Sequence, residues 1–287
     1  MPLSDFWIVV RWWGSLFLIG AAAYPLTKRL FIAGLSGSGL KKLQGQTPSW
    51  YDGGYLFSKA VGMAVITWIV YAAGTARILP FSIVSIGLAL GALFVAGLWM
   101  NRGHKGDRGY RAMIWGELFF FSALLFWSFI KAHEPSIRGL EKFMDFGFMQ
   151  SILNTKYFPA QDPWFAGSGI NYYYFGHITT AILTKLSGID LAYAFNLMLT
   201  TLFAFTLTMS FSIGKQLTNY FGGLLTAFLV TLAGNLQTLY AFTKGYTGDN
   251  VQPFWKLLGE INLNGYWYAN ATRFIPYTIH EFPGYSF

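Results

Sequence analysis

Residues 81–100 read FSIVSIGLALGALFVAGLWM, a run without a charged side chain. About 20 apolar residues in a helix cross the hydrocarbon core of a bilayer, so this stretch predicts a transmembrane helix. Four further stretches have a similar composition: residues 57–76, 112–130, 191–213 and 220–242. Residues 6–24 are a sixth candidate, interrupted by Arg11, whose long side chain can reach the interface. The sequence therefore predicts an all-α, polytopic transmembrane bundle.

The composition of the whole chain supports the same fold class. Apolar residues make up 54% and charged residues 11%, whereas soluble domains have roughly 45–50% and about 25%. So few charges cannot coat the surface of a soluble protein of this size. Cysteine is absent, which excludes disulfides and thiolate sites. The net charge of +8 is spread over several loops, which fits anionic lipid headgroups and argues against a nucleic-acid partner.

Loop charges predict the orientation of the spans. Loops 25–56 and 101–111 each carry four basic residues against one aspartate, whereas residues 132–172 carry more acidic than basic side chains. Because cytoplasmic loops are enriched in Lys and Arg, the first two loops are predicted to be cytoplasmic. Residues 132–172 then form a long extracytoplasmic loop, and the N-terminus lies outside.

The segment 173–186 is short for a crossing and decides the topology of the remaining chain. If it crosses, the chain from residue 243 lies inside. If it is a surface or re-entrant helix, that part lies outside and Lys215 falls in a cytoplasmic turn. The charge rule favours the second arrangement.

The segment from Glu134 to His177 carries the chemistry, and it reads EPSIRGLEKFMDFGFMQSILNTKYFPAQDPWFAGSGINYYYFGH. Apolar residues recur at helical spacing over residues 140–153, which predicts an amphipathic helix along the membrane surface. Glu141 and Asp145 lie four residues apart and share a face of this helix. Such a pair can hold a divalent cation, share a proton in acid/base chemistry, or simply be solvated.

Each other polar residue of this region has two interpretations. Asp162 precedes Pro163 and is typical of a turn cap. The tyrosines at 172–174 form either an aromatic belt at the interface or a wall that binds sugar or phosphate. His177 is either a structural donor or a catalytic group. Glu117, inside a predicted span, is either functional or close enough to the end of the span to reach the interface.

Several stretches of the chain resemble the YYY-domain family of uncharacterised prokaryotic membrane proteins. The loop contributes GLEKFMDFGFM at 139–149 and YFPAQDPWFAGSGINYYYFGH at 157–177. WYDGGYLFSKAVG at 50–62 and ATRFIPYTIHEFPGYSF at 271–287 agree in the same order. Family members are usually longer, so the resemblance implies a chain truncated within its domain. It suggests an N-terminal membrane region of three spans at 1–112, followed by a core at 113–287.

That family is in turn distantly similar to the GT-C glycosyltransferases. Those enzymes carry acidic residues in their first large extracytoplasmic loop and take sugars from polyprenyl-phosphate carriers. The similarity implies a multi-pass enzyme of the prokaryotic plasma membrane that uses such a donor at the extracytoplasmic face. It makes Asp145 the base and Glu141 its partner. Their spacing is Glu-x-x-x-Asp rather than Asp-x-Asp or Asp-Glu, which weakens the case for a Mg²⁺ or Mn²⁺ ion.

The same similarity suggests substrate contacts and leaves two rival functions open. The predicted phosphate contacts are Arg138, Lys142 and His177. The predicted sugar contacts are Asn171, Tyr172, Tyr173 and Tyr174, and Asp162 is a further predicted substrate contact. The tail residues His280 and Glu281 are predicted to complete the cavity. A transporter or flippase would need ionisable groups deep in several spans. The predicted spans hold few such groups, chiefly Glu117 and Arg11, and both lie near the ends of their spans, which argues against transport. A non-catalytic membrane assembly protein is the other alternative.

Overall fold

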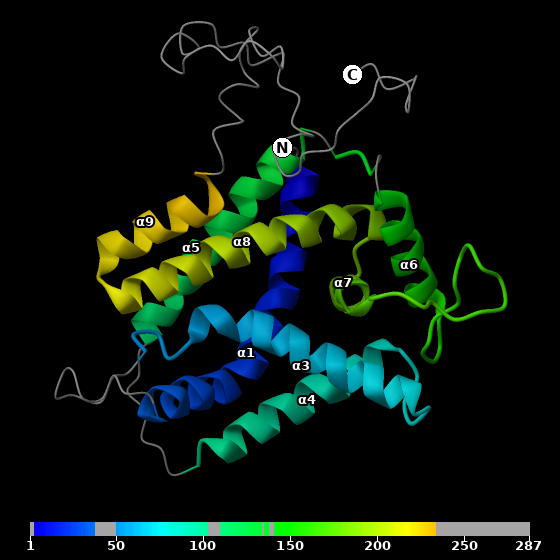
Figure 1. The fold of residues 1–287 in the computed structure, drawn as a ribbon, viewed down its shortest axis with the longest axis horizontal. Coiled ribbons are helices and arrows are strands. Elements are labelled where there is room, and N and C mark those ends of the chain that lie inside the picture. Colours follow the sequence, from blue (N-terminus) through cyan, green and yellow to red (C-terminus); the bar gives the residue numbers. More distant parts are fainter. Residues whose placement is uncertain (1–2, 38–49, 103–109, 134, 138–140, 234–287) are drawn as a thin grey trace, which may run out of the picture. The chain divides into compact units, whose positions relative to one another are not determined.

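The computed structural model describes residues 3–37, 50–102, 110–133, 135–137 and 141–233. Within these ranges every regular element is an α-helix, apart from one bridged residue pair, Gln161 and Gly169. Figure 1 labels the helices: α1 (Leu3–Gly37), α3 (Tyr55–Thr75), α4 (Ile83–Met100), α5 (Tyr110–Lys131), α6 (Lys142–Asn154), α7 (Phe175–Ser187), α8 (Leu191–Leu217) and α9 (Tyr220–Thr231). The predicted all-α, polytopic class is confirmed.

Five of the described helices are long and apolar enough to cross a membrane. They are Leu3–Phe31 within α1, and α3, α4, α5 and α8. α9 covers the start of the predicted span at 220–242, and residues from 234 onward lie outside the described part. The chain divides into two compact units, residues 1–227 and 228–287, and the packing below concerns the first. The predicted boundary after residue 112 stays a prediction.

Polar residues mark the start of the long helices. Asp52 lies just before α3. Its carboxylate accepts hydrogen bonds from the backbone N–H groups of Gly54 and Leu56, at 2.9 and 3.1 Å, and so stabilises the start of the helix. Gly54 lies in the left-handed region at φ 76°, and a Cβ there would collide with the ring of Phe31. Asp190 caps α8 in the usual way by accepting from the N–H of Ala192. These caps fix where the spans begin.

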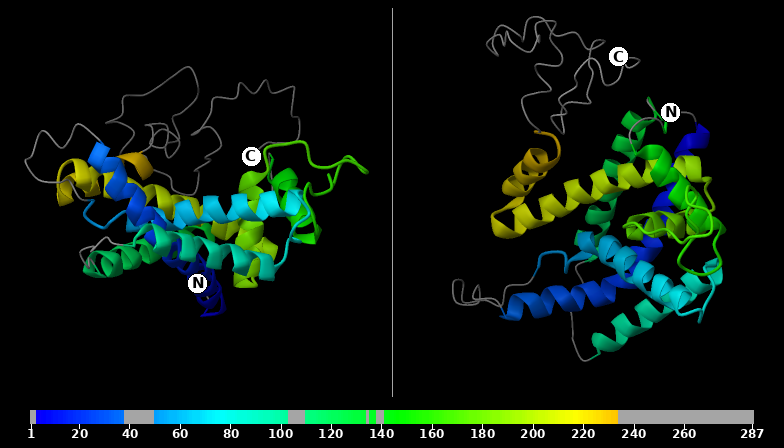
Figure 2. Two further views of the ribbon diagram at one scale, coloured as in Figure 1. Left: turned by 90° about the horizontal axis from the view of Figure 1, so that it is seen from below. Right: turned by 45° about the vertical axis from the view of Figure 1, so that its right-hand side comes forward.

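The helices pack in two groups joined by α7. α1 packs against both α3 and α4, α5 packs mainly against α8, and α7 contacts helices of both groups. Figure 2 shows α3 and α4 running side by side. Gly62 allows the close approach of α1 and α3, since a Cβ there would lie 2.7 Å from Ile19. Small residues serve the same purpose in other membrane proteins.

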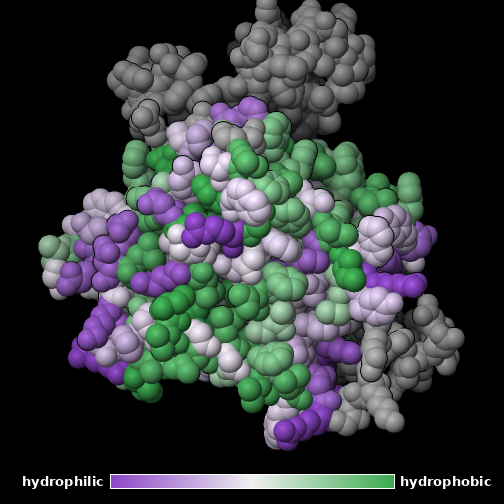
Figure 3. All heavy atoms as spheres, turned by 180° about the vertical axis from the view of Figure 1, so that it is seen from behind, coloured by the Kyte–Doolittle hydropathy of each residue, from purple (hydrophilic) through white to green (hydrophobic). Residues whose placement is uncertain are grey.

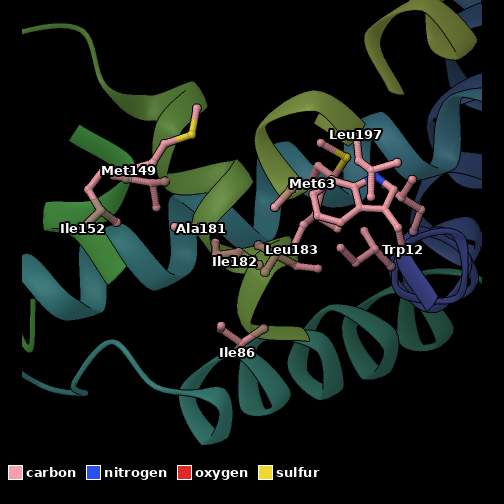
Figure 4. Packing of buried hydrophobic residues seen from close by; sticks show 14 of the residues in the cluster. Trp12, Met63, Ile86, Met149, Ile152, Ala181, Ile182, Leu183 and Leu197 are labelled. Carbon is pink, nitrogen blue, oxygen red and sulfur yellow. The ribbon is translucent and has the colours of Figure 1, made fainter. Parts of the chain in front are cut away.

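The interior of the bundle is filled from both sides of α7. Figure 4 shows Ala181, Ile182 and Leu183 between Met149 and Ile152 of α6 on one side and a cluster of Trp12, Met63 and Leu197 on the other. All of these side chains are buried. Conversely, many large apolar side chains are exposed, for example Val95 and Trp115. Figure 3 shows hydrophobic residues over the middle of one face and more hydrophilic ones toward its sides, as lipid solvation requires.

α7 does not have the length of a span. It contains 13 residues, which is short of the roughly 20 that a crossing needs, and Figure 1 shows it end-on while α3 and α8 run across the view.

Trp50, just before α3, donates to Ser212 near the C-terminal end of α8 at 3.0 Å. Lys215 lies in the last turn of α8, and this end of α8 is beside the first predicted cytoplasmic loop, as the re-entrant arrangement requires.

The exposed side chain of Arg11 contacts the end of α7, and its predicted reach to the interface stays a prediction. Its guanidinium donates to the carbonyl oxygens of Ser187 and Gly188, at 2.8 and 3.0 Å. These carbonyls end α7, where the helix dipole and unpaired acceptors favour a cation. A charged side chain of the first span thus binds the C-terminal end of the short helix.

Candidate functional site

The predicted amphipathic helix exists, and it places Asp145 at its beginning. The prediction over residues 140–153 corresponds to α6, which buries Phe148, Met149 and Ile152. Asp145 lies in the first turn, and its N–H donates to the carbonyl oxygen of Glu141 at 3.0 Å. A carboxylate in the first turn is stabilised by the helix dipole. Asp145 therefore lies on a helix, as the sequence pattern predicts.

Asp145 contacts His177, which comes from a different helix. The Nε2 of His177, in the first turn of α7, donates to Oδ1 of Asp145 at 3.0 Å. The two side chains differ in access, because Asp145 is 32% exposed and His177 only 12%. The edge of the Phe148 ring holds the imidazole, with ring centroids 5.8 Å apart and planes at 89°. The structure thus joins two predicted site residues into one pair.

The contact with Asp145 indicates which ring nitrogen of His177 carries a proton. Nδ1 of His177 is buried and has no hydrogen-bond partner among the described residues. Because a carboxylate oxygen only accepts, the contact with Asp145 places a proton on Nε2. The carboxylate then fixes this tautomer, as in other Asp–His pairs. Such a pair can accept and hold a proton.

The three tyrosines have three different environments. Tyr172 and Tyr173 are stacked, with centroids 3.9 Å apart, and the hydroxyl of Tyr172 donates to that of Tyr173 at 2.6 Å. This hydrogen bond, with burial and the nearby charges of Glu141 and Asp145, raises the pKa of Tyr172 to about 12. Tyr173 is 76% exposed, whereas Tyr174 is buried against Tyr71 of α3. The triplet is therefore not a uniform belt.

A short hairpin forms the outer wall of the site. Residues 160–170 fold back on themselves, and Figure 2 shows them projecting from the helices. Asp162 caps the turn as predicted, because its Oδ1 accepts from the N–H groups of Trp164 and Phe165, at 2.8 and 3.0 Å. Trp164 then lies directly over Gly147 of α6, where a Cβ would be 2.6 Å from the indole.

An open pocket lies between α6 and this hairpin, and we call it the α6 pocket. Its volume is about 500 Å³ and its lining residues are Phe143, Met144, Phe148, Asp162 and Trp164. Phe148 contacts both Trp164, at 5.6 Å between ring centroids, and His177. The α6 pocket is therefore separated from the Asp145–His177 pair by one side chain.

The other predicted residues are less closely engaged. Glu141 and Asn171 are exposed, and Lys142 is half-buried at the start of α6. Arg138, His280 and Glu281 lie outside the described residues. Across the described ranges, no three His, Asp or Glu side chains converge in the way that a metal ion needs, and Asp145 is already bound to His177. The Mg²⁺ or Mn²⁺ ion considered above stays a prediction.

Sequence reasoning missed a second polar cluster, which is centred on Lys59. This lysine of α3 is 1% exposed and forms an ion pair with Glu117 of α5. Glu117 also accepts hydrogen bonds from Trp13 and Tyr55, each at 2.6 Å. Of the two interpretations of Glu117, the one that places it at the interface does not hold, since the residue is 9% exposed. The signal was present, because Lys59 lies inside the predicted span at 57–76.

Comparison with known proteins gives a family without an assigned activity. No curated protein and no solved structure matches the chain. A model of the family described as uncharacterized membrane protein (DUF2298) matches residues 63–287. The matched range includes α4 to α9, the hairpin and the Asp145–His177 pair. The chain therefore belongs to the DUF2298 family of membrane proteins.

Proposed function

We propose that this membrane protein is a glycosyltransferase of GT-C type, which moves a sugar from a polyprenyl-phosphate donor to an acceptor at the extracytoplasmic face of a prokaryotic plasma membrane. The observation that carries the proposal is the contact between Asp145 and His177 beside the open α6 pocket. Asp145 lies in the segment 132–172, whose charge predicts an extracytoplasmic position. A lipid-linked donor would present its headgroup at that boundary.

The geometry supports a separate task for each member of the pair. Asp145 is the more accessible side chain and would accept the proton of an acceptor hydroxyl. The hydroxyl oxygen forms a bond to the anomeric carbon, and the bond from that carbon to the phosphate oxygen breaks. The electron pair leaves with the polyprenyl phosphate. His177 is nearly buried and holds the carboxylate in place, so it is a positioning residue.

Charge stabilisation of the leaving phosphate would come from cationic side chains. Lys142 at the start of α6 is the described candidate, and Arg138 remains a predicted one. Preorganised cations near a developing negative charge are an established way to lower such a barrier.

The decisive experiment is Asp145→Asn in the full chain. Asn keeps the size of the side chain and can still accept from His177, but it cannot take a proton. Loss of a general base lowers the rate on the order of 10²–10⁴-fold. Transfer from polyprenyl-phosphate sugars in membranes that contain the protein measures the effect. The matched control is Asp190→Asn, since Asn also caps α8; full activity of Asp145→Asn would refute the assignment.

A transporter or flippase is the second candidate, because an ion pair lies inside the spans. The two candidates differ in which residues they need. Transport would depend on Glu117 and tolerate Asp145→Asn, whereas sugar transfer requires Asp145. Movement of a fluorescent lipid across proteoliposomes, measured for both variants, separates them. A non-catalytic assembly protein would show neither activity.

A further inference from the structure

We infer that the α6 pocket is a saccharide subsite that accepts a neutral pyranose ring and rejects sugar acids. The inference rests on the proposed function and adds to it the position of the ring and the charge of the sugar. It is carried by three features of the pocket: a fixed aromatic face, a carboxylate with spare acceptor capacity, and the sign of the surrounding charge.

The aromatic face belongs to Trp164. Its indole is 60% exposed and lines the pocket. Three contacts fix it: the bare backbone of Gly147 beneath it, the edge-to-face contact with Phe148 at 85°, and the turn closed by Asp162. A rigid, open aromatic ring is a suitable platform for the C–H face of a sugar.

The carboxylate belongs to Asp162, which also lines the pocket. Its Oδ1 accepts from two backbone N–H groups, and a carboxylate has about four acceptor positions. The remaining positions can accept from neighbouring hydroxyl groups of a sugar. One residue therefore both builds the turn that carries Trp164 and provides the polar contact beside it.

The charge of the pocket selects among sugars. Its lining holds one acidic side chain, Asp162, and no basic side chain. A carboxylate on the ligand would approach this like charge without a cation in the lining, which is unfavourable. Since Phe148 contacts both Trp164 and His177, a ring in the pocket would lie beside the proposed base. The phosphate of the donor must then lie outside the pocket.

The test measures binding without turnover. The full chain in phosphatidylethanolamine–phosphatidylglycerol nanodiscs is titrated with the methyl pyranosides of glucose, mannose and galactose, with methyl glucuronide, and with tetramethylammonium. Saturation-transfer NMR is the readout. We expect signal on the ring C–H protons of at least one neutral glycoside and about tenfold weaker binding of the glucuronide, which corresponds to about 1.4 kcal/mol.

Variants link that signal to the pocket. Trp164→Ala should abolish it, and Trp164→Phe, which keeps an aromatic ring, should retain part of it. Asp162→Asn keeps the acceptor that closes the turn, so it should weaken neutral binding and reduce the discrimination against glucuronide. The matched control is Trp115→Ala, which removes another exposed tryptophan far from the pocket along the chain and should change nothing.

Each contrary result has a distinct meaning. Absence of signal from all neutral glycosides, or equal binding of the glucuronide, would overturn the inference, and so would binding of tetramethylammonium alone. Asp145→Asn should still bind the glycoside, because the subsite does not use that residue. A chain that binds sugar normally but transfers none would refute the proposed reaction and leave the subsite standing.

Discussion

Lys59 of α3 and Glu117 of α5 form an ion pair within the membrane-spanning part of the bundle, and both side chains are buried. The carboxylate of Glu117 also accepts from Trp13 of α1 and Tyr55 of α3. α5 otherwise packs mainly against α8. The pair therefore joins the two groups of helices, and a charge that would be very costly alone is tolerated because its hydrogen-bonding capacity is used.

Removal of one partner should be far more harmful than removal of both. Lys59→Met leaves a buried carboxylate and Glu117→Gln leaves a buried ammonium, and each should lower the free energy of unfolding by about 3–5 kcal/mol. The double variant should recover a large part of this loss. Thermal unfolding in detergent is the measurement, and Lys156→Met, at an exposed lysine, is the control. Additive effects of the two substitutions would contradict the coupling.

The sequence predicted what depends on composition and local spacing. The spans, α6 and the Asp162 turn follow from apolar runs, from helical periodicity and from turn chemistry, all of which are local. The pairs were not predictable, because Asp145 and His177 meet only when α6 packs on α7, and Lys59 meets Glu117 only when α3 approaches α5. The sequence pattern shows where charged residues occur, but not which residues from other helices they contact.

The stacked tyrosines give a prediction about pH. Tyr173→Phe removes the main cause of the raised pKa of Tyr172 and should return it from about 12 toward the ordinary value of 10. Since the pKa is raised in the folded state, the neutral phenol stabilises the fold below pH 10, and this contribution is lost as the pH rises toward 12. NMR of ¹³Cζ-labelled tyrosine, assigned with Tyr172→Phe, follows the titration. An unchanged midpoint in Tyr173→Phe would exclude the hydrogen bond as the cause.

The orientation of the chain in the membrane can be tested by labelling introduced cysteines. The sequence has no cysteine of its own that would react. Phe165→Cys, at the exposed hairpin, should react with an impermeant maleimide in intact cells. Asn219→Cys, in the turn between α8 and α9, should react only after permeabilisation. Reaction of the Asn219→Cys variant in intact cells would show that the chain crosses the membrane at α7, which would contradict the re-entrant arrangement. Both sites are exposed, so reactivity in detergent serves as the control for each.

The unequal surroundings of Glu141, Asp145 and His177 predict an order of effects on sugar transfer. Glu141 is exposed and influences the site through its charge on Tyr172, so Glu141→Gln should reduce the rate less than Asp145→Asn does. His177→Phe keeps a ring against Phe148 but releases the carboxylate. It should lower kcat more than it raises KM, because a positioning residue acts on the reacting geometry.

The same surroundings predict the response to chelators. If Asp145 is held by His177 rather than by a metal ion, EDTA should leave transfer unchanged, and Glu141→Gln should remain the mildest of the three variants. If Glu141 and Asp145 instead held a cation together, their substitutions would be equally harmful and activity would return on addition of Mg²⁺ or Mn²⁺. Rates of the three variants, each measured with and without EDTA, decide between these cases. An equal loss of transfer rate in Glu141→Gln and Asp145→Asn, together with sensitivity to EDTA, would contradict the Asp–His pair. It would indicate that Glu141 and Asp145 bind a metal ion together.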